Sequence, residues 1–348
     1  MNQFTLVRPR QDARKRRGPK RLMSAIASCV LFAAANSVSA QAQQPTASPP
    51  PSDMKGCAST PIMERFDDLV RTGSMSPELG RWLFDPTAQY MAPYQAFDNV
   101  YYVGVCWVSS WLIKTSEGVI LIDTLHEPFV DQLLQNIRSV GVDPKDIKYV
   151  LMTHGHFDHV GGAYKLKPLT GAQFVMTQTG WNEAIRDSAA SQKSPRPWSM
   201  IAQDRVVKDG DEIRLGDQVV RVYETPGHTY GTASYSYTVK EGAKSWGAFT
   251  VGGLGLNAIE NSRQVEAFIA SVDRIAQLMD SPTRPIEVHL TTHPFTNGLT
   301  EAKEGLKNRK PGDPHPLVDP QGFRAQLASL RAGAVERLAT EKKKEAAR

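Results

Sequence analysis

The sequence predicts an α/β fold of the αββα kind, in which two β-sheets pack face to face and helices cover their outer sides. Apolar residues make up 41% of the chain, which is enough for a substantial core. Segments rich in β-branched and aromatic residues come in two batches, and each batch ends in segments of helical periodicity. No repeat and no internal boundary interrupts them, so we expect a single domain over residues 57–345 with a C-terminal helix.

Residues 1–40 have the pattern of an export signal. The basic cluster RKRRGPKR is followed by an apolar run over 22–38 and by small residues of the kind that signal peptidase recognises. A membrane anchor is the alternative, but the run is short and contains Ser and Asn. We therefore predict a signal peptide at 1–40, a disordered Pro-rich lead-in at 41–56, and an exported, periplasmic protein.

The positive charge of the chain is concentrated in that signal. The formal net charge is +5, but eight of the 41 basic and one of the 36 acidic residues lie in residues 1–40. The remainder has 33 basic and 35 acidic residues and a net charge of −2. Such a chain has no electrostatic footprint for a phosphate backbone. We expect no nucleic-acid partner, no membrane association after cleavage, and a monomer.

Two cysteines remain beyond the signal, Cys57 and Cys106. In an oxidising compartment an isolated pair is more often bridged than free. A bridge across this separation of 49 residues would stabilise the fold by about 4 kcal/mol in the loop-entropy model. The alternative is a pair of buried thiols.

The first batch of strands surrounds one helix. Residues 99–115 and 118–124 are rich in β-branched and aromatic residues, and indicate the strands of a hairpin. Residues 127–141 carry apolar residues at helical spacing and end at a glycine, and a short apolar strand follows at 147–153. This batch ends with a strand at 172–177, a helix near 179–187 and an irregular Pro/Ser-rich loop at 191–199.

The second batch consists of short strands followed by helices. Four segments have strand composition: 211–215, 218–225, 232–239 and 247–252. A long helix over 262–279 precedes an apolar strand at 286–292. An amphipathic helix at 322–343 closes the chain, and we expect it to dock through its stripe of Leu and Val residues.

Residues 153–162, THGHFDHVGG, carry three of the chain's eight histidines and an aspartate directly behind the predicted strand at 147–153. Catalytic groups gather at the carboxyl ends of strands in α/β folds. Zinc prefers imidazole nitrogen and carboxylate oxygen, and catalytic sites supply three protein ligands per ion. In an extended turn His154 and His156 point the same way, and a helical bend behind them turns Asp158 and His159 towards a second ion.

Each half of this cluster lacks one ligand. His228 in TPGHT and His293 in TTHPF each follow a predicted strand and can complete the two sets. His289 competes with His293, but we prefer His293 because His289 lies within the apolar strand and not beyond its end. We expect His126 and His315 to be ordinary residues, although His126 also follows a strand.

These residues resemble a known family. THGHFDHVGG, Asp123 in LIDT, His228 in PGHT and His293 in HP follow one another as in the metallo-β-lactamase superfamily, over roughly residues 95–300. The resemblance implies the αββα metallo-β-lactamase fold, which hosts β-lactamases, lactonases, thioesterases, sulfatases and nucleases.

Two further features narrow the resemblance to the third subclass of class B β-lactamases, subclass B3. Many superfamily hydrolases bridge their metals with an aspartate where this chain has glycine in GAFTVGGLGLN, and another subclass uses a cysteine, whereas no cysteine follows Cys106. The segments KGC and YYVGVC, which contain Cys57 and Cys106, also resemble a disulfide pair of some B3 members.

The resemblance implies two Zn²⁺ per chain. The two ligand sets would be His154, His156 and His228 for one ion, and Asp158, His159 and His293 for the other. The ions would hold a hydroxide that opens the β-lactam amide without a protein nucleophile, with Asp158 orienting that hydroxide. Asp123 would accept the far N–H of a ligand histidine, the alternative being a strand-end cap.

The chain departs from subclass B3 where the substrate carboxylate is held. Members commonly place serines there, and the matching region here gives Gly252, Gly253 and Leu254, while Tyr230 stands where proline is usual. We predict a zinc-dependent hydrolase of β-lactams or related small molecules. The main alternative is a dizinc hydrolase of another ester, lactone or thioester. Weaker alternatives are a zinc-binding protein without catalysis and a diiron redox protein, whose branch usually has an acid in place of His156.

Overall fold

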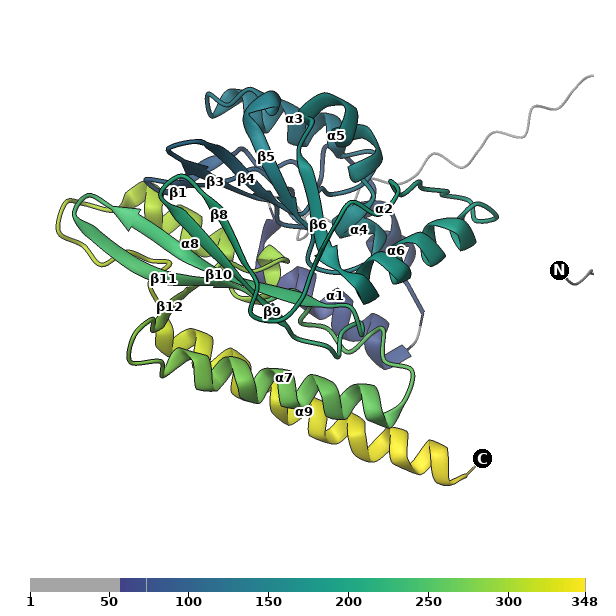
Figure 1. The fold of residues 1–348 in the computed structure, drawn as a ribbon. Coiled ribbons are helices and arrows are strands. Elements are labelled where there is room, and N and C mark those ends of the chain that lie inside the picture. Colours follow the sequence, from purple (N-terminus) through teal and green to yellow (C-terminus); the bar gives the residue numbers. More distant parts are fainter. Residues whose placement is uncertain (1–56, 73, 348) are drawn as a thin grey trace, which may run out of the picture. The chain divides into compact units, whose positions relative to one another are not determined.

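Two β-sheets organise the computed structural model, which describes residues 57–72 and 74–347 (Figure 1). The larger sheet has seven strands that neighbour one another in chain order: β1 (Tyr94–Phe97), β2 (Val100–Tyr102), β3 (Trp111–Thr115), β4 (Gly118–Ile122), β5 (Ile147–Leu151), β6 (Gln173–Thr177) and β7 (Arg205–Val207). Strands β1 to β4 pair antiparallel and β4 to β7 pair parallel. The carboxyl ends of the parallel strands therefore lie along one edge, where groups from several loops can meet.

The smaller sheet has five strands in the order β12 (Ile286–His289), β11 (Lys244–Thr250), β10 (Ala233–Glu241), β9 (Gln218–Glu224) and β8 (Glu212–Leu215). Its strands pair antiparallel except β11 and β12. Strand β9 alternates buried and partly exposed residues, as expected for a strand with one face on the core. Its buried Val220 and Val222 belong to the same apolar core as Ile120 and Leu121 of β4, so the two sheets share one core.

Helices lie outside the sheets. The first group is α1 (Ser59–Thr72), α2 (Pro77–Trp82), α3 (Val130–Ser139), the 3₁₀ turn η2 (Pro144–Asp146), α4 (Phe157–Val160), α5 (Ala163–Thr170) and α6 (Gln178–Ser191). The second group is α7 (Ser262–Met279), η3 (Pro294–Thr296), α8 (Leu299–Asn308) and α9 (Pro320–Ala346). Figure 1 shows α3 and α5 outside the larger sheet, and α7 and α9 side by side outside the smaller one. The αββα prediction is therefore confirmed.

Helix α9 docks through part of the predicted stripe. Phe323, Leu327 and Ala334 are buried against Phe268 and other apolar residues of α7. Burial of a Phe or Leu side chain contributes about 1.5–3 kcal/mol. Val335 is 46% exposed, so the stripe consists of Phe, Leu and Ala and does not include that valine.

Other elements differ from the sequence predictions in extent. Residues 103–110, predicted within a strand, form an irregular loop between β2 and β3. The strands β1 and β7 and the helices α1, α2, α5 and α8 are additional to the predicted elements. The predicted signal peptide at 1–40 and lead-in at 41–56 lie outside the described residues, and the single domain at 57–345 stays a prediction. Among the described residues, none of the helices combines the length and apolarity needed to cross a bilayer.

Candidate metal centre

The motif THGHFDHVGG leaves the carboxyl end of β5 and bends once. His156 has extended backbone angles, φ −70° and ψ 145°, and is the N-cap of the short helix α4. His154 and His156 therefore belong to an extended segment, whereas Asp158 and His159 lie in the first turn of a helix. This bend separates the four polar side chains into two pairs that face different partners.

The first pair meets His228, which follows β9. The Nε2 atom of His154 lies 3.0 Å from Nδ1 of His156, and Nε2 of His228 lies 3.1 Å from each of these atoms. Imidazole nitrogens bound to one zinc ion lie about 2.0–2.1 Å from it, so nitrogens near 3 Å apart are spaced as ligands of a single ion. His154 and His228 are buried, and His156 is partly exposed.

The second pair meets His293, which follows β12. The Oδ2 atom of Asp158 lies 3.2 Å from Nε2 of His159, and that nitrogen lies 3.3 Å from Nε2 of His293. Asp158 and His293 are 3.9 Å apart through the same atoms. The structure thus brings together all six residues that the sequence suggested as ligands, in two sets of three.

Asp123 organises the base of both sets. Its buried carboxylate lies 2.8 Å from Nδ1 of His159 and accepts two bonds from Thr153, from the backbone N–H at 2.8 Å and from the hydroxyl at 2.9 Å. Because the Thr153 hydroxyl donates to Asp123, it accepts from Nδ1 of His154 at 3.2 Å. Asp123 therefore fixes a proton on Nδ1 of His159 and His154 and turns the Nε2 atom of each ring towards the centre.

Backbone conformation at Asp123 and Gly162 permits this arrangement. Asp123 has φ +60°, a left-handed conformation that is rare outside glycine, and directs the chain after β4 towards α4. A Cβ on Gly162 would lie 2.3 Å from the carbonyl oxygen of Thr124. The backbone N–H of Gly162 donates to the Leu125 carbonyl at 2.8 Å. A larger residue at this position would push α4 away from Asp123.

Backbone carbonyls orient the two remaining histidines. Nδ1 of His228 lies 2.7 Å from the carbonyl oxygen of Gly255, and Nδ1 of His293 lies 2.7 Å from that of Trp107. A carbonyl oxygen only accepts, so each Nδ1 carries the proton and each Nε2 presents a lone pair to its set. Sequence reasoning missed both acceptors, because every residue has a carbonyl and no side-chain pattern marks these two.

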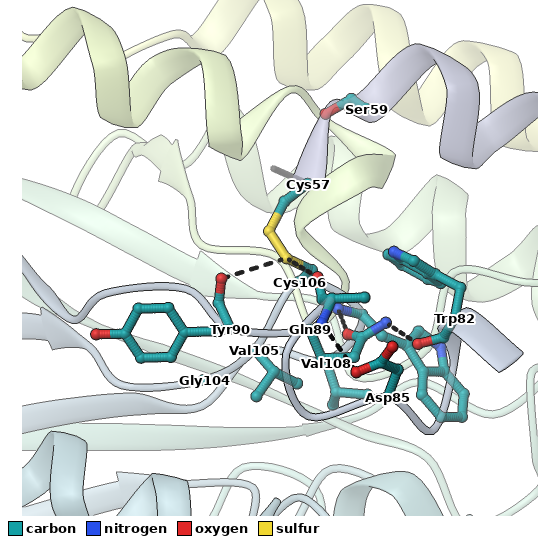
Figure 2. The surroundings of a disulfide bond; sticks show 12 residues. Cys57, Ser59, Trp82, Asp85, Gln89, Tyr90, Gly104, Val105, Cys106 and Val108 are labelled. Carbon is teal, nitrogen blue, oxygen red and sulfur yellow. Dashed lines mark hydrogen bonds between the residues drawn. A yellow bond between two sulfur atoms is a disulfide. The ribbon is translucent and has the colours of Figure 1, made fainter. Parts of the chain in front are cut away.

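The loop at 103–110, which supplies the Trp107 carbonyl, is anchored at several points (Figure 2). Cys57 and Cys106 are at disulfide distance, with their Cα atoms 5.1 Å apart. The buried side chain of Gln89 accepts from the Trp107 N–H at 2.8 Å and donates to the Trp82 carbonyl at 2.9 Å. The loop that orients His293 is thus linked to α1's amino-terminal side and to α2.

The electrostatics of the first set favour neutral imidazoles. Burial lowers the pKa of His156 to about 3, an effect to which His228 adds, and lowers the pKa of His228 itself to about 4. Burial also holds the pKa of His154 well below its ordinary value. Neutral imidazole is the protonation state that binds metal ions.

In the second set His159 lies between two carboxylates, Asp158 of the set itself and Asp123 behind it. Burial disfavours the charged form of His159, but Asp158 and Asp123 outweigh burial and raise the pKa of His159 to about 10. Burial likewise opposes ionisation of Asp158, but His159 outweighs it and holds the pKa of the carboxyl well below its ordinary range. Burial lowers the pKa of His293 to about 4. Two carboxylates around one imidazole attract a positive charge, and a divalent cation among these ligands would replace the proton on His159.

Gly252 and Gly253 are packed too tightly for serines, which subclass B3 members commonly have in this region, to replace them. A Cβ on Gly252 would lie 1.9 Å from the carbonyl oxygen of Ala233, and one on Gly253 would lie 2.6 Å from the His228 ring. These glycines let the chain after β11 pass directly over His228. Leu254 is buried in the apolar contact between this chain segment and α7.

The other histidines lie outside the two sets. His289 stacks on Phe323 and bonds Gln326 through Nδ1, which places it towards α9. His315 stacks on Phe97. His126 is buried in an aromatic cluster with Phe84, Trp107, Phe129 and Phe157, and its ring nitrogens have no hydrogen-bond partner in the described part of the chain.

Two pockets reach residues of the motif THGHFDHVGG. The larger, of about 770 Å³, reaches Phe157 and is lined by aromatic and basic side chains that include Phe84, Arg196 and Trp198. The smaller, of about 350 Å³, reaches His156 and is lined by polar side chains that include Glu183, Arg186 and Asn257. Phe157 and His156 are adjacent in the motif, so both pockets reach the bend that separates the ligand sets.

Comparison with known proteins agrees with this geometry. Residues 103–241 match the model of the family described as the metallo-beta-lactamase superfamily. The chain is 33% identical over 112 residues to a hydroxyacylglutathione hydrolase of Maricaulis maris, a match that covers 32% of this chain and 36% of that protein. The chain spans only 27% to 36% of the length of the first curated relatives that it matches.

Solved structures match over a larger part of the chain. BJP-1, a subclass B3 metallo-beta-lactamase of Bradyrhizobium japonicum, is 28% identical with a TM-score of 0.63, and the match covers 73% of this chain and 96% of that one. The native FEZ-1 metallo-beta-lactamase of Legionella gormanii is 24% identical with a TM-score of 0.65, and the match covers 73% of this chain and 98% of that one. The second likeness concerns the fold alone.

Proposed function

We propose, because residues 103–241 match the model of the metallo-beta-lactamase superfamily, that this chain is an exported dizinc hydrolase that opens the amide of β-lactams. The observation that carries the proposal is the convergence of two sets of three donor atoms, each set within 4.8 Å. Five imidazole nitrogens and one carboxylate oxygen fit zinc, which takes nitrogen and oxygen ligands and keeps a position free in catalytic sites. The likeness to BJP-1 supports the substrate class.

Zinc ions bound in the two sets would supply a Lewis acid for the carbonyl and an activated water. The residues of the chain fix the geometry in which this chemistry occurs. Asp158 has a carboxylate oxygen facing His159 and His293, and we assign to it the orientation of the attacking water. Asp123 and the Gly255 carbonyl hold ligand rings in the tautomer that the chemistry needs.

The pockets suggest how a substrate would lie. A ring amide at the centre can extend one substituent towards the aromatic pocket at Phe157 and another towards the polar pocket at His156. The guanidinium carbon of Arg196 lies 3.4 Å from the centre of the Phe84 ring, which places a cation at the aromatic pocket. A substrate carboxylate would be attracted to Arg196 or to the ions themselves. Either would take over the role of the serines that subclass B3 members commonly have at positions 252 and 253.

A second candidate is hydrolysis of a thioester, an ester or a lactone. The tight packing of Gly252 and Gly253 favours it, because it removes the usual binding site of a β-lactam carboxylate. The match to the Maricaulis maris hydroxyacylglutathione hydrolase points to a thioester among these.

The experiment is a substrate panel on the zinc-loaded chain that begins at residue 41. Opening of a penicillin, a cephalosporin and a carbapenem is followed by absorbance, with and without a chelator, beside a hydroxyacylglutathione thioester and a lactone. We expect chelator-sensitive opening of β-lactams. No such turnover of any β-lactam would overturn the proposal, and faster turnover of the thioester or lactone would establish the second candidate.

A matched pair of variants distinguishes loss of a proposed ligand from loss of a nearby histidine outside the ligand sets. His293→Gln removes a proposed ligand, and we expect kcat/KM to fall by about 100-fold or more, since loss of even an outer partner of a ligand costs about 10- to 100-fold. His289→Gln alters a buried histidine at the end of β12, the strand that precedes His293, and because His289 bonds Gln326 we expect kcat/KM to change little. Equal losses in both variants would contradict the ligand assignment.

Export is proposed on the pattern of residues 1–40 and on the disulfide distance between Cys57 and Cys106, which suits an oxidising compartment. We expect the protein in a periplasmic fraction with its first residue near Gln41. Recovery in the cytoplasmic fraction with Met1 retained would contradict this part of the proposal.

A further inference from the structure

The loop at 251–261, between β11 and α7, contacts His228 from two directions. The Gly255 carbonyl accepts from Nδ1 of His228 at 2.7 Å, and Gly253 lies so close that an added Cβ would meet the His228 ring at 2.6 Å. The same loop supplies one wall of the pocket at His156 through residues 257–260. The position of this loop therefore sets both the orientation of the His228 ring and the shape of the pocket at His156.

Helix α9 holds this loop from the outside. The guanidinium of Arg337 donates to the carbonyls of Leu256 and Ile259, each at 3.4 Å. Its Nε donates to Oε1 of Glu341 at 2.6 Å, and Lys344 donates to the same oxygen at 2.9 Å. The Glu341 side chain is only 6% exposed and accepts from both Arg337 and Lys344, which holds the Arg337 guanidinium beside the loop.

The same helix fixes the end of the loop. Glu345 accepts from the backbone N–H of Ser262 at 2.8 Å and from its hydroxyl at 2.7 Å, at the first turn of α7. Gln264, in the same first turn, donates to the carbonyls of Gly227 at 2.9 Å and His228 at 3.2 Å. The start of α7 thus connects α9 to the backbone of the proposed ligand as well as to the loop above its ring.

We propose that Arg337 is a positioning residue of the metal centre: through the carbonyls of Leu256 and Ile259 it holds the loop whose Gly255 orients His228. The proposal rests on the proposed metal-binding function. It assigns to the C-terminal helix a role in binding the ion of the first set, although no side chain of α9 belongs to that set. Arg337→Met is the informative change, because it keeps an apolar stem against the loop and removes every donor.

The control is Arg331→Met, two turns earlier on α9. Arg331 pairs with Asp273 of α7 at 2.7 Å, so its loss weakens the α7–α9 contact without touching the loop. Two readouts apply that need no turnover. Peptide-level hydrogen exchange of the metal-free protein reports on residues 251–261, and competition with a chelator reports the affinity for each of two zinc ions.

We expect Arg337→Met to speed hydrogen exchange in residues 251–261 by about tenfold. It should also lower the affinity for one of the two zinc ions by about tenfold, which is the lower end of the effect of removing an outer partner of a metal ligand. Arg331→Met should do neither, and Arg337→Lys, which keeps a donor, should recover most of both effects. The same behaviour in Arg337→Met and Arg331→Met would overturn the proposal, as would faster exchange without a change in ion affinity. Should Arg337→Met not fold, Arg337→Leu, which also has no donor, takes its place in both readouts. A wild-type chain that binds zinc but opens no β-lactam would overturn the proposed function and leave this inference standing.

Discussion

The loop at 103–110 and the loop at 251–261 perform the same task with different attachments. Each presents one backbone carbonyl to Nδ1 of a proposed ligand histidine at 2.7 Å, Trp107 to His293 and Gly255 to His228. The first loop is attached by the Cys57–Cys106 pair and by the buried side chain of Gln89. The second is attached by polar contacts from α9 and by close packing of glycine on the histidine ring.

The difference indicates how each loop will respond to change. A covalent link constrains the unfolded chain, so its loss lowers the stability of the whole fold. Polar contacts on a surface helix act on the folded state, so their loss shows locally, at the loop and the ion beside it. Three changes test this contrast, in decreasing order of expected effect.

The largest effect is expected from loss of the disulfide. The double variant Cys57→Ser with Cys106→Ser should lower the free energy of unfolding by about 4 kcal/mol and the melting temperature by about 10 °C. Binding of one ion should weaken with it, because the Trp107 carbonyl loses one of its anchors. Denaturant unfolding and zinc competition measure the two quantities. A loss of stability with unchanged ion affinity would mean that Gln89 alone holds the Trp107 carbonyl.

An intermediate effect is expected from Gly253→Ser. The new Cβ cannot occupy its site 2.6 Å from the His228 ring unless that ring moves, so affinity for the first ion should fall by about tenfold. Gly333→Ser, where an added Cβ meets no atom within 4 Å, is the control. Zinc competition and KM for a β-lactam are the measurements. A lower KM in Gly253→Ser would show that the loop gives way and that serine can bind the substrate there.

The smallest effect is expected in the pH dependence of stability, which a buried histidine outside both loops contributes to. Burial lowers the pKa of His289 to about 3, well below the value of about 6.5 in an unfolded chain. Between these values the unfolded chain binds a proton that the folded protein does not, so stability is present above pH 6.5 and falls as pH drops. The slope from this residue is at most about 1.4 kcal/mol per pH unit. Denaturant unfolding between pH 7 and 5 should show a shallower slope in His289→Gln, and an identical slope would contradict the assignment.

Much of the fold could be predicted because the strands carry strong local patterns. The segments at 147–153 and 218–225 have the apolar composition of strands and nearly coincide with β5 and β9. The helices α1 and α8 were missed because their residues are held by distant parts of the chain. Ser59 at the start of α1, for instance, donates to Glu301 of α8 at 2.7 Å, across 242 residues. Such a contact has no local signal.

The side chains of the site could be predicted from the sequence, but the groups that surround and orient them could not. The spacing of His154, His156, Asp158 and His159 suggests two ions, and the positions after strands select His228 and His293. The backbone acceptors at Trp107 and Gly255 and the reach of Arg337 depend on how loops pack after folding. Their residue types carry no chemistry that singles them out beforehand.

The separation of the ligands along the chain has a consequence for folding. His228 meets His154 across 74 residues, and His293 meets His159 across 134. An ion that encounters the unfolded chain therefore finds only the local donors of one short motif, and contacts between such distant residues form slowly. On the proposed function, high affinity for zinc would develop only after both sheets have closed on each other. A bound ion would then stabilise the completed fold by mass action, so zinc should slow unfolding of this protein more than it speeds folding.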